Sequence, residues 1–371
     1  MKALLKELIQ ADTTVQQGEL AAAELIAEHL RPVGVDCRID SWDGNRANLT
    51  ARVKSGSANK AILFACHLDV VPVGEGVWEH SPFSGFEKDG RIYGRGATDM
   101  KGGIAAIVTA IKQVAEAGHN LNRDVIVVCA GGEETDSCGA KRFLEKHSGE
   151  LPELTGIIIP EPTDFDVVTA HRGMLWLKII TRGKTAHSST PELGVNAISS
   201  MNKVLSALEN YTFPVEPNEL LGECSLSVNT ITGGKAFNVV PDKCEIGIDI
   251  RTLPGQHKEQ IISDLQKLCS KLRKEHPDFD AEIVFDREVS ALQTDIKSAF
   301  VKEFCSIVNV DKTTAVGFTT DGPHFNELNA PVVIFGPGKP ELCHKPNEYI
   351  NIADLEKAVE HYKSIILKFC K

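Results

Sequence analysis

The stretch VIVVCAGGEE, residues 125–134, decides the fold class of this chain. Its six apolar residues form an unbroken run, which predicts a strand buried on both faces and ended by the two glycines. Similar short apolar runs occur at 61–65, 157–159 and 332–335, and a helical pattern closed by glycine covers 104–117. Buried strands separated by helices are typical of an α/β fold with a mainly parallel sheet.

Polar residues follow each of these predicted strands almost at once. In open α/β sheets, ligand sites gather at the carboxyl ends of the strands. The sequence therefore predicts that side chains from widely separated segments converge on one site. These side chains are His67 and Asp69, Glu133 and Glu134, Glu161, and His344.

The middle of the chain has a different pattern. Strand-like and helical segments follow one another in the order βαββαβ, which predicts a ferredoxin-like sandwich. We therefore expect a complete small domain inserted at 173–288, inside a larger discontinuous domain formed by 1–172 and 289–371. The segments are 174–181, 196–208, 226–232, 244–252, 258–272 and 281–285.

The bulk composition excludes several classes of function. The 371 residues carry a formal net charge of −11, so neither nucleic acid nor an anionic membrane is indicated as a partner. No signal peptide is visible, and no apolar run is long enough to span a bilayer. The ten cysteines are scattered without a CxxC pair, which indicates reduced thiols in a cytoplasmic protein.

Two short motifs contain candidate metal ligands. In His67-Leu68-Asp69, a neutral imidazole is a good zinc ligand, and a carboxylate that accepts its other N–H fixes its direction. Asp99 lies in GRGATDMKGG, residues 94–103, where glycines allow a close approach of the backbone. The ordinary alternatives are a loop histidine beside a turn aspartate, and an aspartate that caps the following helix. A phosphate-binding loop is not supported, because the spacing is neither GxGxxG nor GxxxxGK[ST].

Carboxylates at the ends of two strands extend this set. Glu133 and Glu134 repel each other unless one binds a cation and the other takes a proton, which is what a metal hydrolase needs. The alternative is an exposed acidic loop. Glu161 lies between Pro160 and Pro162, which fix its backbone direction. Two histidines and three carboxylates suit two metals that share a carboxylate better than a single zinc ion.

These segments resemble the co-catalytic zinc amidohydrolases that include acetylornithine deacetylase, succinyl-diaminopimelate desuccinylase, aminoacylase and glutamate carboxypeptidase. The resemblance covers essentially the whole chain, and its five motifs occur in the family's order. It implies two Zn²⁺ ions per subunit, with Co²⁺ or Mn²⁺ as alternatives. The motifs are HLDVVP (67–72), GRGATDMKGG (94–103), GEE (132–134), EPT (161–163) and the loop around His344. By the resemblance, His67 and Glu161 bind one ion, Glu134 and His344 bind the other, and Asp99 binds both.

The resemblance also implies the catalytic roles. Glu133 would be the general base for the water shared by the two metals, and Asp69 would orient His67. The inserted segment 173–288 resembles the family's lid and dimerisation domain. There His187, within TAHSS (185–189), would donate to the developing oxyanion, commonly across a dimer interface. The ordinary alternative is that His187 caps a strand end or faces solvent.

Four further residues match positions that hold the substrate. Arg251 and Asn238 would grip the substrate carboxylate, for which the planar fork of arginine is well suited. Thr319 and Arg172 are further candidates. A salt bridge or a turn is the structural alternative for Arg251 and Asn238.

The sequence therefore predicts a metal-dependent hydrolase that cleaves the amide bond of an N-acyl amino acid. A zinc carboxypeptidase or dipeptidase is the alternative, and a silent metal-dependent binding protein is a third reading that the intact Glu133 argues against. The expected partners are an N-acyl amino acid or short peptide and a second copy of the chain, bound through the inserted domain. The arginine usual after Asp-Gly is replaced by Pro323 and His324, which leaves the substrate open.

Overall fold

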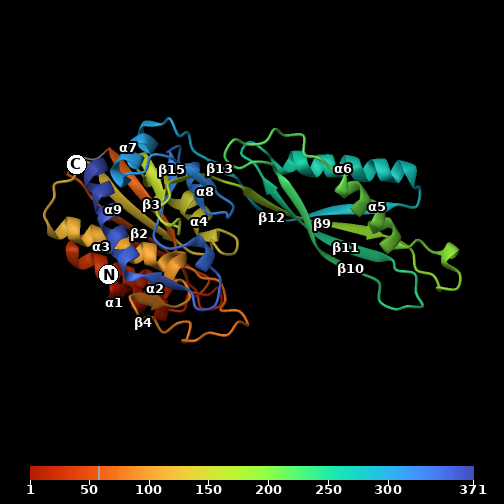
Figure 1. Ribbon diagram of the computed structural model, residues 1–371, viewed down its shortest axis with the longest axis horizontal. Helices are drawn as coiled ribbons and strands as arrows, with labels where there is room; N and C mark the ends of the chain where they lie inside the picture. Colours follow the sequence, from red (N-terminus) through yellow and green to blue (C-terminus); the bar gives the residue numbers. More distant parts are fainter. Residues whose placement is uncertain (57–58) are drawn as a thin grey trace. The chain divides into compact units, whose positions relative to one another are not determined.

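The computed structural model describes residues 1–56 and 59–371. These residues form two compact units (Figure 1). The first comprises 1–169, 294–315 and 320–371, and the second comprises 170–293 and 316–319. The segment predicted to be inserted, 173–288, lies within the range of the second unit.

Nine strands of the described residues form the main sheet. They are β1 (Asp36–Trp42), β2 (Arg46–Val53), β3 (Lys60–His67), β6 (Asp124–Ala130), β7 (Glu153–Ile159), β8 (Val168–His171), β13 (Leu292–Gln293), β14 (Thr314–Val316) and β15 (Val332–Ile334). The four central strands, in the order β6–β3–β7–β15, run parallel. Antiparallel strands flank them, with β2 and β1 on one side and β8 and β13 on the other. The mainly parallel α/β fold predicted from the sequence is confirmed, because the unbroken apolar runs form the central strands.

The helices of the first unit bury their apolar sides against this sheet. The most buried is α3, in which Ile104, Ile107 and Ile111 all lie in the core. In α9 a buried stripe recurs at helical spacing, and the hydroxyl of Tyr362 donates to the carbonyl of Phe335 (3.1 Å). The helices are α1 (Lys2–Gln10), α2 (Leu20–Leu30), α3 (Gly102–Glu116), α4 (Cys138–His147), α7 (Ala299–Val308), α8 (Gly322–Asn326) and α9 (Ile352–Cys370).

Shorter elements complete the first unit. A small antiparallel sheet contains β4 (Phe86–Lys88), β5 (Arg91–Tyr93) and β16 (Tyr349–Asn351). Single helical turns cover Arg31–Val33, Ala97–Lys101, Ser148–Glu150 and Pro340–Leu342. No helix of residues 1–56 and 59–371 combines the length and the apolar character that crossing a membrane requires.

The second unit has the predicted ferredoxin-like order. Its elements are β9 (Gly173–Arg182), a turn at Pro191–Leu193, α5 (Ala197–Glu209), β10 (Ser225–Gly233), β11 (Lys243–Thr252), α6 (Lys258–Glu275) and β12 (Asp280–Val289). The strands pair antiparallel in the order β10–β11–β9–β12. Side chains alternate along β9 and β11, so one face of the sheet joins the core with α5 and α6 while the other stays partly exposed.

Candidate active site

Three of the predicted site segments leave the parallel sheet at the same edge. His67 is the last residue of β3 and pairs with Ala130, the last residue of β6. The chain then turns through Gly131 and Gly132, where a positive φ of 85° at Gly132 favours glycine, and it reaches the two glutamates. Glu161 follows two residues after the end of β7. Parallel register therefore brings these side chains to one place.

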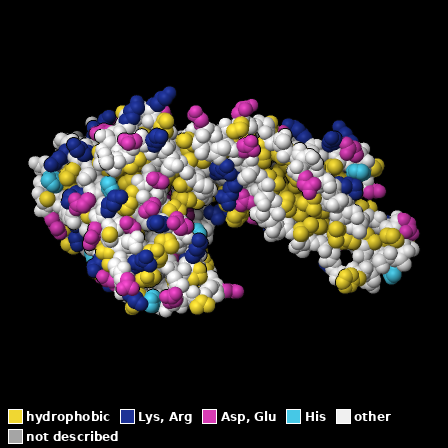
Figure 2. All heavy atoms as spheres, viewed as in Figure 1, with side chains coloured by type: hydrophobic (Ala, Val, Ile, Leu, Met, Phe, Trp, Pro, Cys, Tyr) yellow, Lys and Arg dark blue, Asp and Glu magenta, His cyan; other side chains and the backbone are white. Residues whose placement is uncertain are grey.

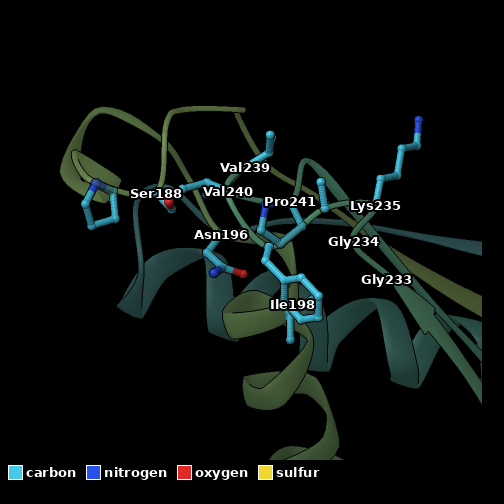
Figure 3. Close-up of a pocket in the computed structure, with 12 residues that line it drawn as sticks. Ser188, Asn196, Ile198, Gly233, Gly234, Lys235, Val239, Val240 and Pro241 are labelled. Carbon is cyan, nitrogen blue, oxygen red and sulfur yellow. The ribbon is translucent and has the colours of Figure 1, made fainter.

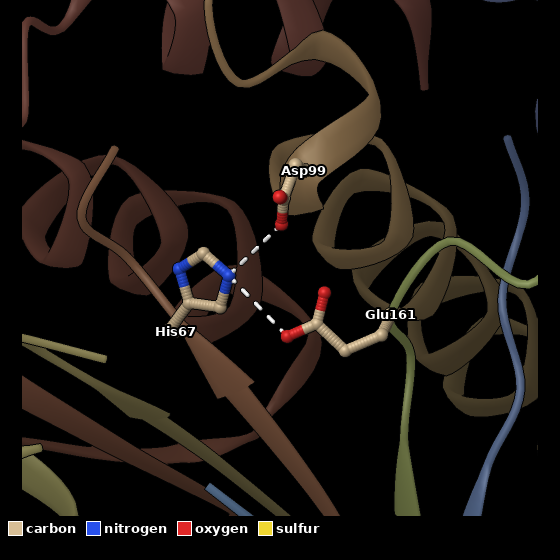
Figure 4. A group of neighbouring side chains, drawn as sticks. All are labelled: His67, Asp99 and Glu161. Carbon is tan, nitrogen blue, oxygen red and sulfur yellow. Dashed lines mark hydrogen bonds and ion pairs between the residues drawn. The ribbon is translucent and has the colours of Figure 1, made fainter. Parts of the chain in front are cut away.

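The five predicted ligands form two groups around Asp99. Nε2 of His67 lies 3.2 Å from Oδ1 of Asp99 and 3.4 Å from Oε1 of Glu161 (Figure 4). Nε2 of His344 lies 3.2 Å from Oδ2 of Asp99 and 3.0 Å from Oε1 of Glu134. Within each group the ligand atoms lie within 4.8 Å of one another. Imidazole and carboxylate donors suit divalent transition metals, so this donor set fits two metal ions that share Asp99.

Crowding and burial alter the carboxyl groups of this site. Burial, reinforced by the charge of Asp99, raises the pKa of Glu161 to about 8 and also raises the pKa of Glu134. Burial is also the main cause of the raised pKa of Glu133, with Asp321 and Glu134 adding repulsion. Burial and mutual repulsion thus disfavour the ionised form of these carboxyl groups. Bound metal cations would stabilise the ionised form.

The two histidines carry the positive charge that the carboxylates require. Hydrogen bonds to Asp99 and Glu134 raise the pKa of His344 to about 10. Burial alone would lower the pKa of His67, but Glu161 and the other nearby carboxylates raise it well above its usual value. In the metal-free protein, protons therefore occupy the positions that metal ions would take.

Comparison with known proteins decides the family. Residues 63–368 match the sequence model of the peptidase family M20/M25/M40. The chain belongs to this family. The resemblance inferred from the five motifs is confirmed, and this M20 enzyme is a hydrolase of amide bonds in a metal-dependent family.

Curated relatives match over nearly their whole length. This M20 enzyme is 30% identical over 380 residues to an acetylornithine deacetylase of Myxococcus xanthus, covering 100% of this chain and 97% of that protein. It is 28% identical over 403 residues to a probable succinyl-diaminopimelate desuccinylase of Staphylococcus aureus (strain MRSA252), covering 99% and 97%.

Two solved structures share the fold. An aminopeptidase from Bacillus cereus ATCC 10987 has a TM-score of 0.80 at 21% identity, covering 99% of this chain and 98% of that chain. A dinuclear metal-binding peptidase of the M20 family from Bacillus subtilis has a TM-score of 0.74 at 17% identity, covering 99% of each chain. At such identities these structures establish the architecture alone.

Asp69 connects His67 to the loop of the two glutamates. Nδ1 of His67 lies 3.0 Å from the main-chain oxygen of Asp69 and 3.7 Å from its Oδ1. The carboxylate also accepts the backbone N–H groups of Glu133 (3.1 Å) and Glu134 (3.0 Å). The sequence predicted that the carboxylate would orient His67, whereas the carbonyl group is the nearer partner. The Asp69 carboxylate holds the glutamate loop.

The segment that carries Asp99 is fixed by a residue that sequence reasoning missed. Oε1 of Glu348 accepts the N–H groups of Thr98 (2.9 Å) and Asp99 (3.2 Å), and its Oε2 accepts a bond from Arg95 (2.7 Å). Both charged side chains are buried. A lone glutamate after a polar loop gives no sequence signal of this role. The alternative that Asp99 caps a helix is wrong, since α3 begins at Gly102 and Lys101 precedes it.

The Glu348→Gln variant should be much less stable than the unchanged protein. It leaves the buried Arg95 without its counter-charge, which costs about 3–5 kcal/mol of unfolding free energy. Urea denaturation of the metal-free protein measures this loss. Glu87→Gln is the control, because Glu87 forms exposed ion pairs with Lys2 and Lys6 and should change stability too little to detect. Equal losses in the two variants would contradict the role of Glu348.

His187 and Asn238 lie next to each other in the second unit. The backbones of His187 and Val239 form an isolated antiparallel β-bridge, and the N–H of Ser188 donates to the carbonyl of Asn238 (3.1 Å). Nδ1 of His187 lies 2.7 Å from the hydroxyl oxygen of Ser189. Beside this segment is a pocket of about 580 Å³ lined by residues that include Ser188 and those at 233–237 and 239–241 (Figure 3). The two predicted residues are thus held on one exposed surface.

The other predicted substrate residues also belong to the second unit. Arg251 is partly exposed on β11, with Nε 2.8 Å from Oδ1 of Asp249. The guanidinium of Arg172 donates two hydrogen bonds to the main-chain oxygen of Leu221 (2.6 and 3.1 Å). These bonds hold the backbone at Leu221, which is a structural role. Thr319 is half-buried in an irregular segment grouped with this unit.

Proposed function

We propose that this M20 enzyme is a deacylase that hydrolyses the amide bond of an N-acyl amino acid. The observation that carries the proposal is the position of Asp99, whose two carboxylate oxygens face different histidines. This arrangement suits a carboxylate shared by two metal ions. The names of the two curated relatives, a deacetylase and a probable desuccinylase, describe removal of an acyl group from an amino acid.

The proposed metals are two Zn²⁺ ions per chain. One would be held by His67, Asp99 and Glu161, and the other by Asp99, Glu134 and His344. When bound, such ions polarise the amide carbonyl and lower the pKa of a water molecule.

The chain's own residues handle the protons. Glu133 accepts a proton from the attacking water at its carboxylate and later donates it to the leaving amine. Asp69 holds the backbone of Glu133 in place. His187 would donate to the developing oxyanion through Nε2, because Nδ1 meets the hydroxyl of Ser189.

A substrate panel tests the proposal. The metal-loaded protein should cleave acetylornithine or succinyl-diaminopimelate with a higher kcat/KM than simple dipeptides. Release of free amine measures each rate. Cleavage of dipeptides alone would contradict the deacylase proposal and favour the carboxypeptidase or dipeptidase alternative. The chemistry at the metals is the same in both cases.

Metal binding should release protons and become tighter as the pH rises. The pKa values of His344 (about 10) and Glu161 (about 8) lie above neutrality, so both groups hold protons in the metal-free protein at neutral pH. A metal must displace these protons, and its apparent Kd should therefore fall between about pH 6 and about pH 8. Calorimetry in buffers of different ionisation enthalpy counts the protons. A pH-independent Kd without proton release would contradict this prediction.

We infer that a second copy of the chain pairs through β10. This strand lies at an edge of the second unit's sheet, and Ile231 on it is 58% exposed. Phe237, close along the chain, is fully exposed, and hydrophobic side chains gather on the visible surface of this unit (Figure 2). An edge strand with unpaired backbone groups and an exposed apolar side chain is a template for pairing with another chain.

The Ile231→Lys variant should therefore be monomeric at concentrations where the unchanged protein is a dimer. A charge on the edge strand disfavours strand pairing. Light scattering measures the mass. Phe285→Lys is the matched control, since Phe285 is also exposed but lies on β12 at the opposite edge of the same sheet. A monomeric, fully active unchanged protein would refute the dimer and would mean that His187 is supplied by its own chain or is not needed.

A further inference from the structure

A row of polar and aromatic side chains crosses the open face of the second unit's sheet. In the strand register, Asp249 on β11 pairs with Trp176 on β9, and Trp176 pairs with Arg287 on β12. These residues lie on the face opposite the α5–α6 core, and Trp176 is 36% exposed. A large aromatic side chain thus lies between two charged residues on this open face.

The carboxylate of Asp249 is the centre of this row. Its Oδ1 lies 2.8 Å from Nε of Arg251, and its Oδ2 accepts bonds from Nη2 of Arg251 (3.1 Å) and Nε1 of Trp176 (2.9 Å). The guanidinium of Arg287 lies over the indole ring, 5.8 Å from its centroid. Asp249 and Trp176 therefore hold each other and the Arg251 guanidinium in one geometry.

The two contacts with Asp249 leave the outer edge of the Arg251 guanidinium open to a ligand. A guanidinium has five N–H donors in a planar fork. Asp249 takes the side formed by Nε and Nη2, so the end formed by Nη1 and Nη2 still presents one N–H from each nitrogen. Two parallel N–H groups match the two oxygens of a carboxylate. The side chain of Arg251 is 34% exposed, so an incoming ligand can reach it.

A purely structural purpose explains this pair poorly. Asp249 and Arg251 are two residues apart on the same strand, so their ion pair joins no separate elements of the fold. The Arg251 side chain is 34% exposed, so solvent weakens the contribution of this pair to stability. Its main physical effect is to fix the direction of the guanidinium.

We propose that Asp249 and Trp176 are positioning residues that aim Arg251 for a two-point grip on the free carboxylate of the substrate. The inference rests on the proposed function, in which Arg251 binds that carboxylate. It predicts that N-acyl amino acids with a free carboxylate are better substrates than their carboxamides.

Steady-state kinetics of the metal-loaded, full-length protein test the inference. The probes are the best N-acyl amino acid of the panel and the same compound with its carboxylate converted to a carboxamide. In Asp249→Asn and Trp176→Phe, KM for the acid should rise about tenfold and kcat should stay within about twofold, because the lost contacts serve binding. KM for the carboxamide should not change. Trp176→Phe keeps an aromatic ring and removes the N–H donor.

Glu245→Gln is the matched control. Glu245 also lies on β11 and pairs with Lys243, two residues away on the same strand, at 2.9 Å. This variant should leave both KM values unchanged. If the Asp249 and Trp176 variants behave like Glu245→Gln, or if the unchanged protein cleaves acid and carboxamide equally well, the inference is overturned while the deacylase function stands. Absence of cleavage of every N-acyl amino acid would instead remove the proposed function, and this inference with it.

Discussion

The Glu133→Gln variant should lose about 10²–10⁴-fold in kcat, which is the usual contribution of a general base. Glutamine has nearly the same size as glutamate, but its amide cannot take up the proton of the attacking water. Glu133 belongs to neither group of metal-ligating atoms, so the variant should keep its metals and its fold. The kcat on the best substrate of the panel, with metal analysis of the same sample, measures the effect.

A second variant separates this chemistry from a general loss of charge. Glu145, exposed on the neighbouring helix α4, provides the control variant Glu145→Gln, which should retain full activity. An unchanged kcat in Glu133→Gln would show that another group is the base. Loss of metal from that variant would show that Glu133 is a ligand and leave its role as base unsupported.

The Asp99→Asn variant should lose one or both metal ions, and its activity should fall more than about 100-fold. Replacing a residue that only hydrogen-bonds to a metal ligand usually costs about 10–100-fold, and loss of the ligand itself should cost more. Each oxygen of Asp99 faces a different histidine, at 3.2 Å in both cases. An asparagine keeps one oxygen and loses the charge, so it can serve only one of the two groups. Metal analysis after dialysis measures the number of ions bound per chain.

The control for this variant is Asp89→Asn. Asp89 is exposed in a turn with a positive φ of 49°, a conformation that asparagine accepts readily. Its replacement should change neither metal content nor activity. If Asp99→Asn kept two metals and full activity, the shared-carboxylate arrangement would be wrong.

The sequence predicted much of the site because its signals are local. The apolar runs that precede His67, Glu133 and Glu161 are continuous in the chain, and each forms a parallel strand with a polar residue at or just beyond its end. Asp99 follows no predicted strand, and its inclusion came from its glycine-rich motif and the order of the family's motifs. His344 follows the apolar run at 332–335, but only after a longer polar loop. The geometry brings both to the same cluster.

Contacts between distant segments could not be predicted in this way. Glu348 holds the Asp99 segment from 249 residues away, and the two Asp69 carboxylate oxygens hold the glutamate loop from 64 and 65 residues away. The pairing of Asp249 with Trp176 spans 73 residues. Each is a hydrogen bond whose partners meet only after the strands have taken their register, and no spacing along the chain encodes it.

Local sequence patterns predicted the central strands, the elements of the inserted segment, the edge of the sheet where the site forms and the residue types present there. Apolar runs and glycine turns act on neighbouring residues, so they can be read along the chain. Those patterns did not predict which oxygen of Asp99 faces which histidine, what the Asp69 carboxylate holds, or which edge of the Arg251 guanidinium stays open. Those choices depend on side-chain directions and on burial, both of which are set by the packing of segments far apart in the chain.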